Sequence, residues 1–273
     1  MADNSDDRIR LTLSRSTGFM LDVDLRLPSG GVTVLFGVSG CGKTTVLRSA
    51  AGLEKAQGYV RIAGQVWQDD EKHLFVPTYK RRIGYVFQEA SLFDHLNVRE
   101  NLRFGLKRIS DEDGEKRLDD AVELLGIGHL LERRTSELSG GERQRCAIAR
   151  SLAIKPTALF MDEPLAALDH ARRLEIVPWI DRLKKELNLP ILYVTHSEEE
   201  VMRLADRLAV IDNGKLIDNG PVAETWLHLM QKKGRKASRL LLVMGTVEER
   251  DSAWSLMKVV SGACTSGCAI REL

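Results

Sequence analysis

The nine residues GVSGCGKTT, positions 37–45, constrain this chain more than any other stretch. They follow the apolar run Val32–Phe36 and lead into a helix that we expect to begin near Lys43. They fit the pattern G-x-x-x-x-G-K-S/T, in which glycines let several backbone N–H groups face one anion. The lysine adds a point charge for phosphate, and the next hydroxyl can ligate Mg²⁺. A glycine-rich turn without a ligand is the alternative, and it leaves the flanking strand and helix unexplained.

Further short apolar runs follow this phosphate loop, and each suits one buried strand. Helix-forming segments separate these runs, an alternation that is typical of an α/β core. The runs are Ile83–Phe87, Ala158–Met161, Ile191–Val194 and Leu208–Ile211. Near the start of the chain, Ile9–Leu13 and Met20–Leu27 alternate polar and apolar residues, which predicts an antiparallel edge.

The segment from about residue 89 to 155 has helical spacing and no convincing strand. Helices are expected there over residues 98–105, 112–125 and 142–153. Asn213-Gly214 predicts a hairpin, and Pro221 predicts the start of a last helix. The sequence therefore predicts an α/β fold: a P-loop NTPase core with an antiparallel β edge and a helical insertion subdomain.

Polar side chains follow three of the predicted strands. Asp162 and Glu163 end one strand, His196 follows a second, and Gln88 follows a third. Because ligands of open α/β sheets bind beyond the carboxyl ends of the strands, we expect these side chains near the phosphate loop. Adjacent carboxylates are costly to bury without a partner. Taken singly, the acids also suit an exposed loop, the histidine suits a structural role, and the glutamine carries no signal.

Each of these side chains has a possible task in the hydrolysis of a nucleoside triphosphate. Asp162 could serve Mg²⁺ directly or through water, and Glu163 could orient and polarise the attacking water. His196 could hydrogen-bond the γ-phosphate, and Gln88 could touch both Mg²⁺ and the water.

The stretch TSELSGGERQR, residues 135–145, has two interpretations. Ser139 and Glu142 fit the S-x-x-E capping box, in which each side chain satisfies a backbone N–H at the start of a helix. The same helix terminus could instead hold an anion on its uncovered N–H groups. The chain already carries one phosphate loop, so a second anion site needs its own explanation.

Composition excludes several classes of protein. Forty basic and 39 acidic residues leave a net charge of +1, which argues against a basic surface spread over the whole protein and predicts no nucleic-acid partner. No apolar run is long enough to cross a bilayer, and the polar first ten residues do not resemble a signal peptide. The cysteines show no paired framework, which suits a reducing compartment. Cys264 and Cys268 lack neighbouring histidines, so free thiols are expected there, and a metal site is the alternative.

The order of the motifs along the chain resembles that of the ATP-binding subunits of ABC transporters. The resemblance covers about residues 9–229 and includes the phosphate loop, Gln88, LSGGERQR, FMDEP, LAALD and His196. It implies an ABC ATPase fold that binds ATP and Mg²⁺ and hydrolyses ATP. It also implies a head-to-tail homodimer, in which the Ser139 helix terminus of one chain caps the γ-phosphate of ATP held by the other.

The resemblance assigns residues to three roles. The expected catalytic residues are Glu163, His196 and Gln88, and the expected metal ligands are Thr44, Gln88 and Asp162. Phe19 stands roughly where the family has an aromatic residue that stacks on adenine, although a buried or hairpin phenylalanine fits nearly as well. Asp169 matches the loop that crosses the dimer interface. The expected nucleotide-binding residues are Phe19, Gly37, Val38, Ser39, Gly40, Cys41, Gly42, Lys43, Thr44, Thr45, Ser139, Gly140, Gly141 and Asp169.

Within that family, the phosphate loop and the stretch from Lys80 to Gly105 resemble the molybdate importers. Val38 is the main indication, because sulfate, polyamine and sugar importers usually have proline there. ATPase subunits for sulfate, iron or polyamine import are the alternatives, and a soluble ABC ATPase is a more remote one. The implied partners are a second copy of the chain, a membrane permease docked on residues 89–105 and, indirectly, an external oxyanion-binding protein.

The resemblance also implies a location and a domain division. The chain is expected at the cytoplasmic face of the cell membrane as a peripheral subunit. Residues 1–230 would form the ATPase domain, and residues 231–273 would hold a linker and the start of a truncated C-terminal regulatory region.

Overall fold

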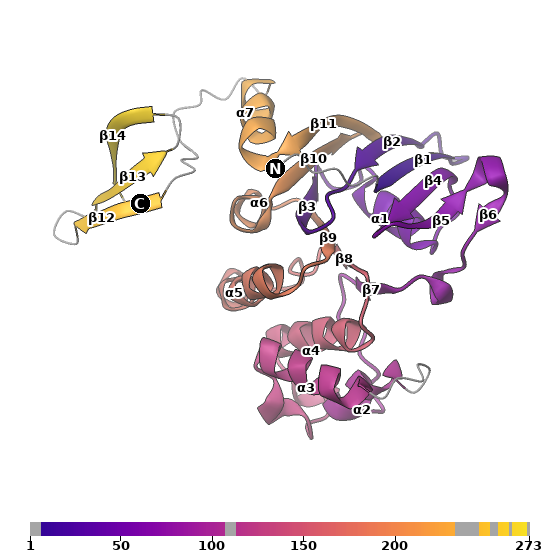
Figure 1. The fold of residues 1–273 in the computed structure, drawn as a ribbon. Coiled ribbons are helices and arrows are strands. Elements are labelled where there is room, and N and C mark those ends of the chain that lie inside the picture. The colour runs from indigo at the N-terminus through magenta and orange to yellow at the C-terminus, as the bar shows by residue number, and fades with distance from the viewer. Residues whose placement is uncertain (1–6, 107–112, 233–245, 252–255, 262–263, 272–273) are drawn as a thin grey trace. The chain divides into compact units, whose positions relative to one another are not determined.

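The computed structural model describes residues 7–106, 113–232, 246–251, 256–261 and 264–271 (Figure 1). Side chains are described only up to residue 232. The chain divides into two compact units, Met1–Val222 and Ala223–Leu273.

One mixed sheet of eleven strands organises the first unit. Its strands lie in the order β6-β5-β4-β1-β2-β11-β10-β3-β9-β8-β7. Their bounds are β1 Arg8–Ser14, β2 Met20–Arg26, β3 Gly31–Phe36, β4 Gln57–Ile62, β5 Gln65–Asp69, β6 Leu74–Phe75, β7 Ile83–Val86, β8 Ala158–Asp162, β9 Pro190–Thr195, β10 Arg207–Asp212 and β11 Lys215–Pro221.

The parallel half of this sheet contains the strands that were predicted from continuous apolar runs. β3 lies between β9 and β10, and β8 lies between β9 and β7, all of them pairing in parallel. Every residue of β8 and of β9 is buried, because helices cover both faces of such a sheet. The carboxyl ends of β3, β7, β8 and β9 therefore meet at one edge.

The other half of the sheet is the predicted antiparallel edge. β1 pairs with β2 and with β4, and apolar residues of β2 alternate with exposed polar ones. β4, β5 and β6 were not predicted, because the segment 57–75 mixes polar and apolar residues without a clear period. The predicted Asn213-Gly214 hairpin is present between β10 and β11, and both turn residues have positive φ.

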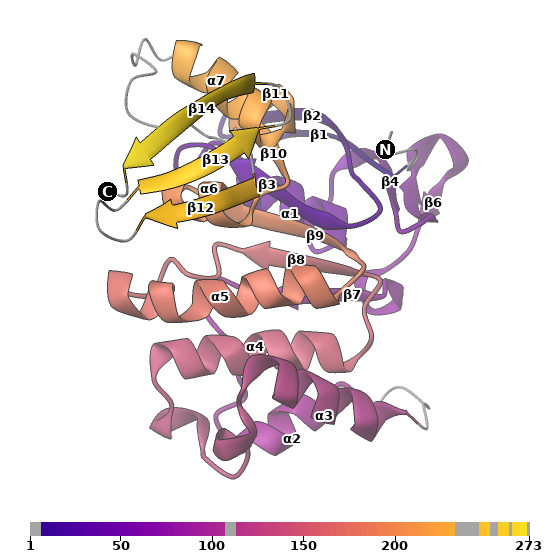
Figure 2. The same cartoon turned by 60° about the vertical axis from the view of Figure 1, so that its left-hand side comes forward.

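Helices cover the sheet and form the insertion. Figures 1 and 2 show α2, α3 and α4 gathered in a lobe of their own, as the helical spacing predicts. α1 packs against β1, β8 and β9, and α6 packs against β3. The bounds are α1 Lys43–Ala51, α2 Val98–Arg103, α3 Gly114–Leu125, α4 Gly140–Ala153, α5 His170–Glu186 and α6 Glu198–Leu204; single 3₁₀ turns span Asp70–Lys72, Thr78–Lys80, Gly128–Leu130 and Thr135–Glu137. The expected start of the second insertion helix at residue 112 lies outside the described residues.

The second unit contains three strands that the sequence did not reveal. β12 (Thr246–Asp251), β13 (Leu256–Ser261) and β14 (Cys264–Arg271) form an antiparallel sheet in that order. α7 (Val222–Lys232) begins one residue later than predicted, because Pro221 ends β11. Residues 231 and 232, where the linker is expected to begin, are helical, and residues 233–245 lie outside the described part. Cys264 and Cys268 lie in β14, where side chains are not described.

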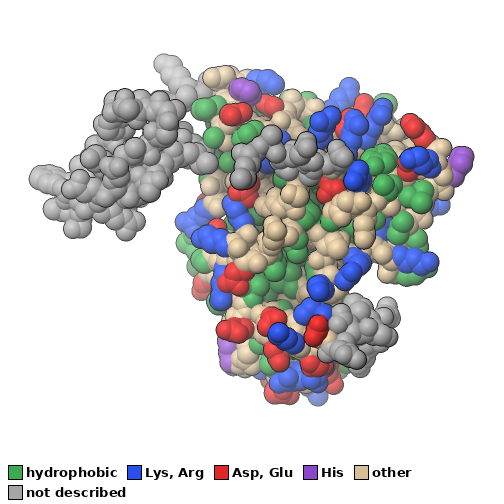
Figure 3. Space-filling view, viewed as in Figure 1, with side chains coloured by type: hydrophobic (Ala, Val, Ile, Leu, Met, Phe, Trp, Pro, Cys, Tyr) green, Lys and Arg blue, Asp and Glu red, His purple; other side chains and the backbone are tan. Residues whose placement is uncertain are grey.

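The surface of the first unit mixes charges. On the face in Figure 3, basic and acidic side chains are interspersed. Among the helices that the structure describes, none combines the length and the apolar character that a bilayer span requires.

Candidate functional site

The phosphate loop leaves β3 and enters α1 through glycines that allow an unusual backbone. Gly40 and Gly42 have φ of 81° and 111°, and Gly42 is the residue just before α1. A Cβ on Gly37 would lie 2.2 Å from the carbonyl oxygen of Ile211, so no side chain fits there. Cys41, within the loop, has a buried side chain, and burial raises the pKa of its thiol. The loop is thus a tight turn pressed against β10.

Lys43, the first residue of α1, points back into this loop. Its side chain is 3% exposed, and Nζ donates to the carbonyl oxygens of Gly37 and Val38 at 2.9 Å each. Nζ also lies 3.6 Å from Glu163 Oε1. The ammonium therefore stands between the loop and the carboxylate that follows β8.

The Asp162 carboxylate, at the end of β8, accepts hydrogen bonds from two hydroxyls. Thr44 Oγ1 donates to Oδ1 at 2.7 Å, and Tyr85 Oη donates to Oδ2 at 3.2 Å. Burial raises the pKa of Asp162, and the two hydrogen bonds act in the opposite direction. Tyr85 was missed, although a tyrosine inside an apolar strand run needs a hydrogen-bond partner and so points to a polar neighbour.

Glu163 joins the phosphate loop to His196. Its backbone N–H donates to the carbonyl of Val194 on β9 at 3.1 Å, which fixes the end of β8 beside the end of β9. Its side-chain Oε2 lies 3.1 Å from His196 Nδ1. Since the Glu163 side chain is 15% exposed and His196 is 52% exposed, the pair lies at the rim of the protein, where water can reach it.

Gln88 follows β7 but stands apart from this cluster. The Gln88 side chain is exposed. Among the described side chains, the hydroxyls of Thr44 and Tyr85 donate hydrogen bonds to Asp162, and Gln88 does not. Gln88 instead lines a cavity of about 370 Å³, together with Gly140 of α4 and the segment Pro164–Leu168. Its place after β7 puts Gln88 at the predicted edge of the sheet. Its side chain, however, contacts neither Thr44 nor Asp162, the other two predicted metal ligands.

The Ser139 helix terminus forms the capping box that the sequence predicted. Ser139 Oγ accepts from the Glu142 N–H at 3.3 Å, and Glu142 Oε2 accepts from the Ser139 N–H at 2.8 Å. A Cβ on Gly140 would lie 2.9 Å from Leu168 Cδ2, so this glycine permits close packing. Figures 1 and 2 both show α4 in the helical lobe, apart from α1.

Two more predicted residues have defined surroundings. Asp169 is an exposed residue whose side chain caps α5 by accepting from the Arg172 N–H at 3.0 Å. Phe19 is half-buried, and its ring edge would lie 3.0 Å from a Cβ on Gly42. The Arg15 guanidinium lies 5.5 Å from the centre of the Phe19 ring and also reaches Thr45 Oγ1 at 3.5 Å. Phe19 therefore borders the phosphate loop, and Arg15 is a neighbour that the sequence did not indicate.

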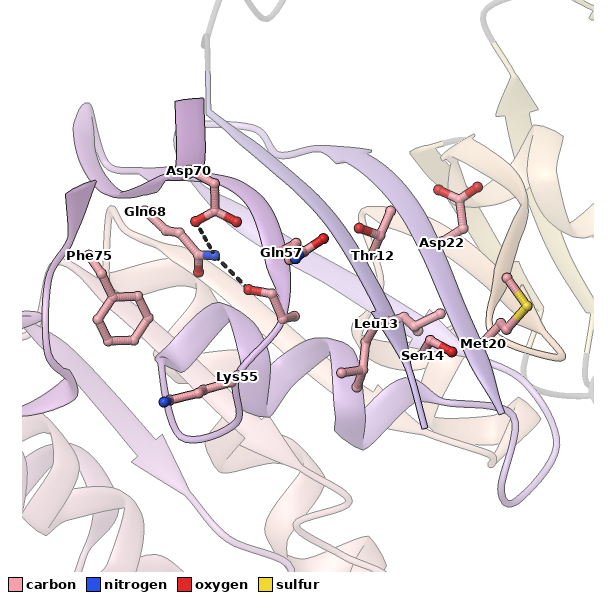
Figure 4. Close-up of a pocket in the computed structure, with 12 residues that line it drawn as sticks. Thr12, Leu13, Ser14, Met20, Asp22, Lys55, Gln57, Gln68, Asp70 and Phe75 are labelled. Atoms are coloured by element: carbon pink, nitrogen blue, oxygen red, sulfur yellow. Dashed lines mark hydrogen bonds between the residues drawn. The ribbon is translucent and has the colours of Figure 1, made fainter. Parts of the chain in front are cut away.

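The antiparallel edge contains a separate hollow of about 810 Å³, to which no phosphate-loop residue contributes (Figure 4). Gln68 lies at its wall, where its amide donates to the Ala56 carbonyl at 2.7 Å and to Asp70 at 3.0 Å. These bonds fix the segment after α1, which includes Glu54, the ion-pair partner of Arg15. Ser14 and Met20, which flank the Arg15–Phe19 turn, line the hollow, so it lies beside that turn.

A lysine, a hydroxyl, two acids and a histidine around a phosphate loop at the strand ends define a P-loop nucleoside triphosphatase. The family model described as "ABC transporter" matches residues 20–166, and the chain belongs to this family of ATP-binding proteins. A relative in Thiobacillus denitrificans, named "Molybdenum import ATP-binding protein ModC", is 54% identical over 89% of this chain and 67% of its own length.

Solved structures agree with this family. The chain is similar to cbiO1 of Clostridium perfringens, part of the ABC transporter complex cbiONQ, with a TM-score of 0.71 and 29% identity over 86% of this chain and 97% of that one. It is also similar to an ATP-binding cassette solved as a dimer with ADP and Pi, with a TM-score of 0.64 and 26% identity over 79% and 98% of the two chains. The predicted fold is confirmed as that of an ABC ATPase.

Proposed function

We propose that this chain is the ATP-hydrolysing subunit of an importer for the oxyanion molybdate. The observation that carries the hydrolytic function is the Glu163 carboxylate, which lies between Lys43 of the phosphate loop and His196. The name of the Thiobacillus relative and the Val38 form of the loop support the choice of molybdate.

Binding of ATP begins at the phosphate loop. Lys43 Nζ donates to two neutral carbonyl oxygens of its own loop. Phosphate oxygens are charged acceptors and form stronger hydrogen bonds than carbonyls do. When ATP binds, the Lys43 ammonium would therefore donate to the phosphates in place of the loop carbonyls. Half-buried Phe19 beside Gly42 offers a face for adenine.

Thr44 and Asp162 fit the requirements of Mg²⁺. A hydroxyl and a carboxylate oxygen lie 2.7 Å apart, and both are the hard oxygen donors that Mg²⁺ prefers. Within the described chain, no three His, Cys, Asp or Glu side chains gather to hold a metal ion, so phosphate oxygens would complete the set. When bound, the ion neutralises charge on the phosphates. Gln88 would join these ligands only after its side chain moves toward them.

Hydrolysis assigns different tasks to Glu163 and His196. A carboxylate within hydrogen-bond reach of a water can take its proton as the water attacks the γ-phosphorus, while the bond from that phosphorus to the β–γ bridging oxygen breaks and ADP leaves. The Nδ1 contact with Glu163 holds the imidazole beside that carboxylate, where Nε2 is available to the γ-phosphate. Lys43 balances negative charge on the other side of the carboxylate.

A second copy of the chain completes each site in this proposal. The first turn of α4 is exposed at Ser139, and Figures 1 and 2 draw α4 in the helical lobe, apart from α1. Its N–H groups and the positive end of its dipole suit a phosphate presented by a partner. Asp169, exposed at the start of α5, would lie at the same interface.

Mixed dimers test this arrangement. Ser139→Arg should block closure, and Lys43→Ala should remove nucleotide affinity, so each variant alone is inactive. A mixed dimer then has one site with both defects and one with neither, and hydrolysis should partly recover. The matched control mixes Lys43→Ala with Glu163→Gln, whose defects lie on the same side of the composite site, so every site keeps a defect. Equal activity in the two mixtures would refute the two-chain site.

The transport role adds a permease and a membrane location. Residues 89–105 are the proposed docking surface, at the cytoplasmic face of the membrane. Phe93 packs on Phe104 at 4.3 Å between ring centres, so exposed His95 is the better position for cysteine cross-linking to a permease. Stimulation of the assembled complex by molybdate, compared with sulfate, tests the substrate, and stimulation by sulfate alone would reassign it.

A further inference from the structure

A tyrosine and a glutamate are paired inside the protein behind His196. Tyr193 of β9 is fully buried, and its hydroxyl donates to Glu200 Oε2 of α6 at 2.8 Å. Glu200 is 6% exposed, and a buried carboxylate is costly unless it is hydrogen-bonded. Burial, followed by the charge of Glu200, raises the pKa of Tyr193 well above its ordinary value, so the phenol keeps its proton and remains the donor. The pair therefore ties α6 to β9.

His196 lies in the short turn between these two elements. Thr195 ends β9, and its Oγ1 accepts from the Ser197 N–H at 3.0 Å. Ser197 caps α6, and its Oγ accepts from the Glu200 N–H at 3.4 Å. Glu200 thus holds the turn twice, through its backbone and through its carboxylate. Because the imidazole itself is 52% exposed, this turn rather than surrounding packing determines where it lies.

We propose that Tyr193 and Glu200 are positioning residues for ATP hydrolysis. Their hydrogen bond holds the turn so that His196 Nδ1 stays within reach of Glu163 Oε2. The inference rests on the proposed roles of His196 and Glu163. Neither member of the pair touches the reacting atoms, and the pair acts only through the place of the imidazole.

The first test is steady-state ATP hydrolysis by the full chain. Tyr193→Phe removes one hydroxyl from a fully buried ring and leaves its packing. We expect kcat to fall about tenfold with little change in KM, since a misplacement near 1 Å can cost about 100-fold. Tyr79→Phe is the matched control, because that ring is 83% exposed. Glu200→Gln keeps an acceptor for the tyrosine and should retain more activity than Glu200→Ala.

A double-mutant cycle separates positioning from general stability. If the pair acts through His196, Tyr193→Phe should lower kcat in the wild-type background and have no further effect in His196→Ala. An equal fall in both backgrounds would overturn the proposal. Thermal unfolding fixes a temperature at which every variant is folded, so that loss of folded protein does not enter the rates.

The same cycle reports on the underlying assignment. If His196→Ala alone leaves kcat unchanged, the proposed role of His196 fails, and the positioning role fails with it. If His196→Ala lowers kcat and Tyr193→Phe does not, the site assignment stands and only the positioning role is wrong.

Discussion

Glu163 has a backbone conformation that is unusual for any residue other than glycine. Its φ is 44°, and such a conformation costs a non-glycine residue about 1 kcal/mol or more. The N–H bond to Val194 keeps it there, and the result is a carboxylate between Lys43 and His196. Strain of this kind persists where the surroundings hold the residue in place, and here it sets the direction of the proposed base.

Glu163→Gln tests that base without changing its shape. The amide keeps the size and the planar shape of the carboxylate beside Lys43, but it cannot take a proton from water. We expect ATP binding to be retained and hydrolysis to fall by about 100-fold or more. Isothermal titration and phosphate release measure the two properties, and unchanged hydrolysis would exclude Glu163 as the base.

Lys43→Ala should reduce ATP binding itself, in contrast to Glu163→Gln, which should retain it. The change deletes the ammonium that donates to the loop carbonyls and faces Glu163. Nucleotide affinity should drop at least about tenfold, equivalent to ~1.4 kcal/mol. Fluorescence titration with a labelled ATP analogue measures it, and Lys80→Ala, far along the chain in an exposed 3₁₀ turn, is the control.

At this scale, sequence reasoning found residues whose position follows from a rule. Lys43 and Thr44 follow from the loop pattern, and Asp162, Glu163 and His196 follow from the strand ends. Tyr85 and Arg15 escaped notice because their contacts join positions 77 and 30 residues apart in the chain. Gln88 obeys the strand-end rule, yet its side chain is not at the cluster, because a rule for backbone position does not fix a rotamer.

Two helix beginnings carry a capping signature in the local sequence. α2 and α4 both start with a full capping box, at Asn97 and at Ser139. Such a box satisfies two backbone N–H groups with two side chains only three residues apart, so local sequence is sufficient to predict it. β4, β5 and β6 depend on neighbours in the sheet, and their residues alone did not reveal them.

Ser139→Ala should therefore weaken α4 before it changes any chemistry. Loss of the cap should lower the free energy of unfolding by about 1 kcal/mol. Urea unfolding of the full chain measures this, and Ser136→Ala, an exposed residue outside the box, is the control. If stability is unchanged, the serine serves mainly another purpose.

The contribution of the Glu142 carboxylate to the stability of the fold should depend on pH. Hydrogen bonding to the Ser139 N–H holds the pKa of Glu142 below its usual value. A lowered pKa stabilises the fold above the ordinary glutamate pKa of about 4.3, and that stability is lost as pH falls through the lowered value. Wild type should exceed Glu142→Gln in stability at neutral pH and converge with it in acid. Exposed Glu175→Gln is the matched control.

For the whole molecule, the α/β core with its helical insertion followed from the order of apolar runs. That order did not predict the strands of the second unit. Among the described strands, β12, β13 and β14 form a sheet of their own. The order of apolar runs also could not give the strand order of the large sheet. β2 meets β11 and β3 meets β10 through pairings between the two ends of the first unit, which no local pattern encodes.

The proposed assembly predicts a change in size. Glu163→Gln should bind ATP without consuming it, so linkage to nucleotide should hold two chains together. Size-exclusion chromatography with ATP should give a dimer, and with ADP a monomer. Adding Ser139→Arg to Glu163→Gln should abolish the ATP-dependent dimer, whereas a monomer in every condition would contradict the two-chain site.

The place of β3 in the sheet governs when this protein becomes functional during its synthesis. The strand before the phosphate loop is made early, yet both of its neighbours, β9 and β10, come from residues 190–212. Non-local pairings form only after the intervening chain is available, and domains fold as units while synthesis proceeds. We therefore expect the phosphate loop to remain unfinished on the ribosome until about residue 212 has emerged, although a nascent chain stalled earlier already holds every loop glycine.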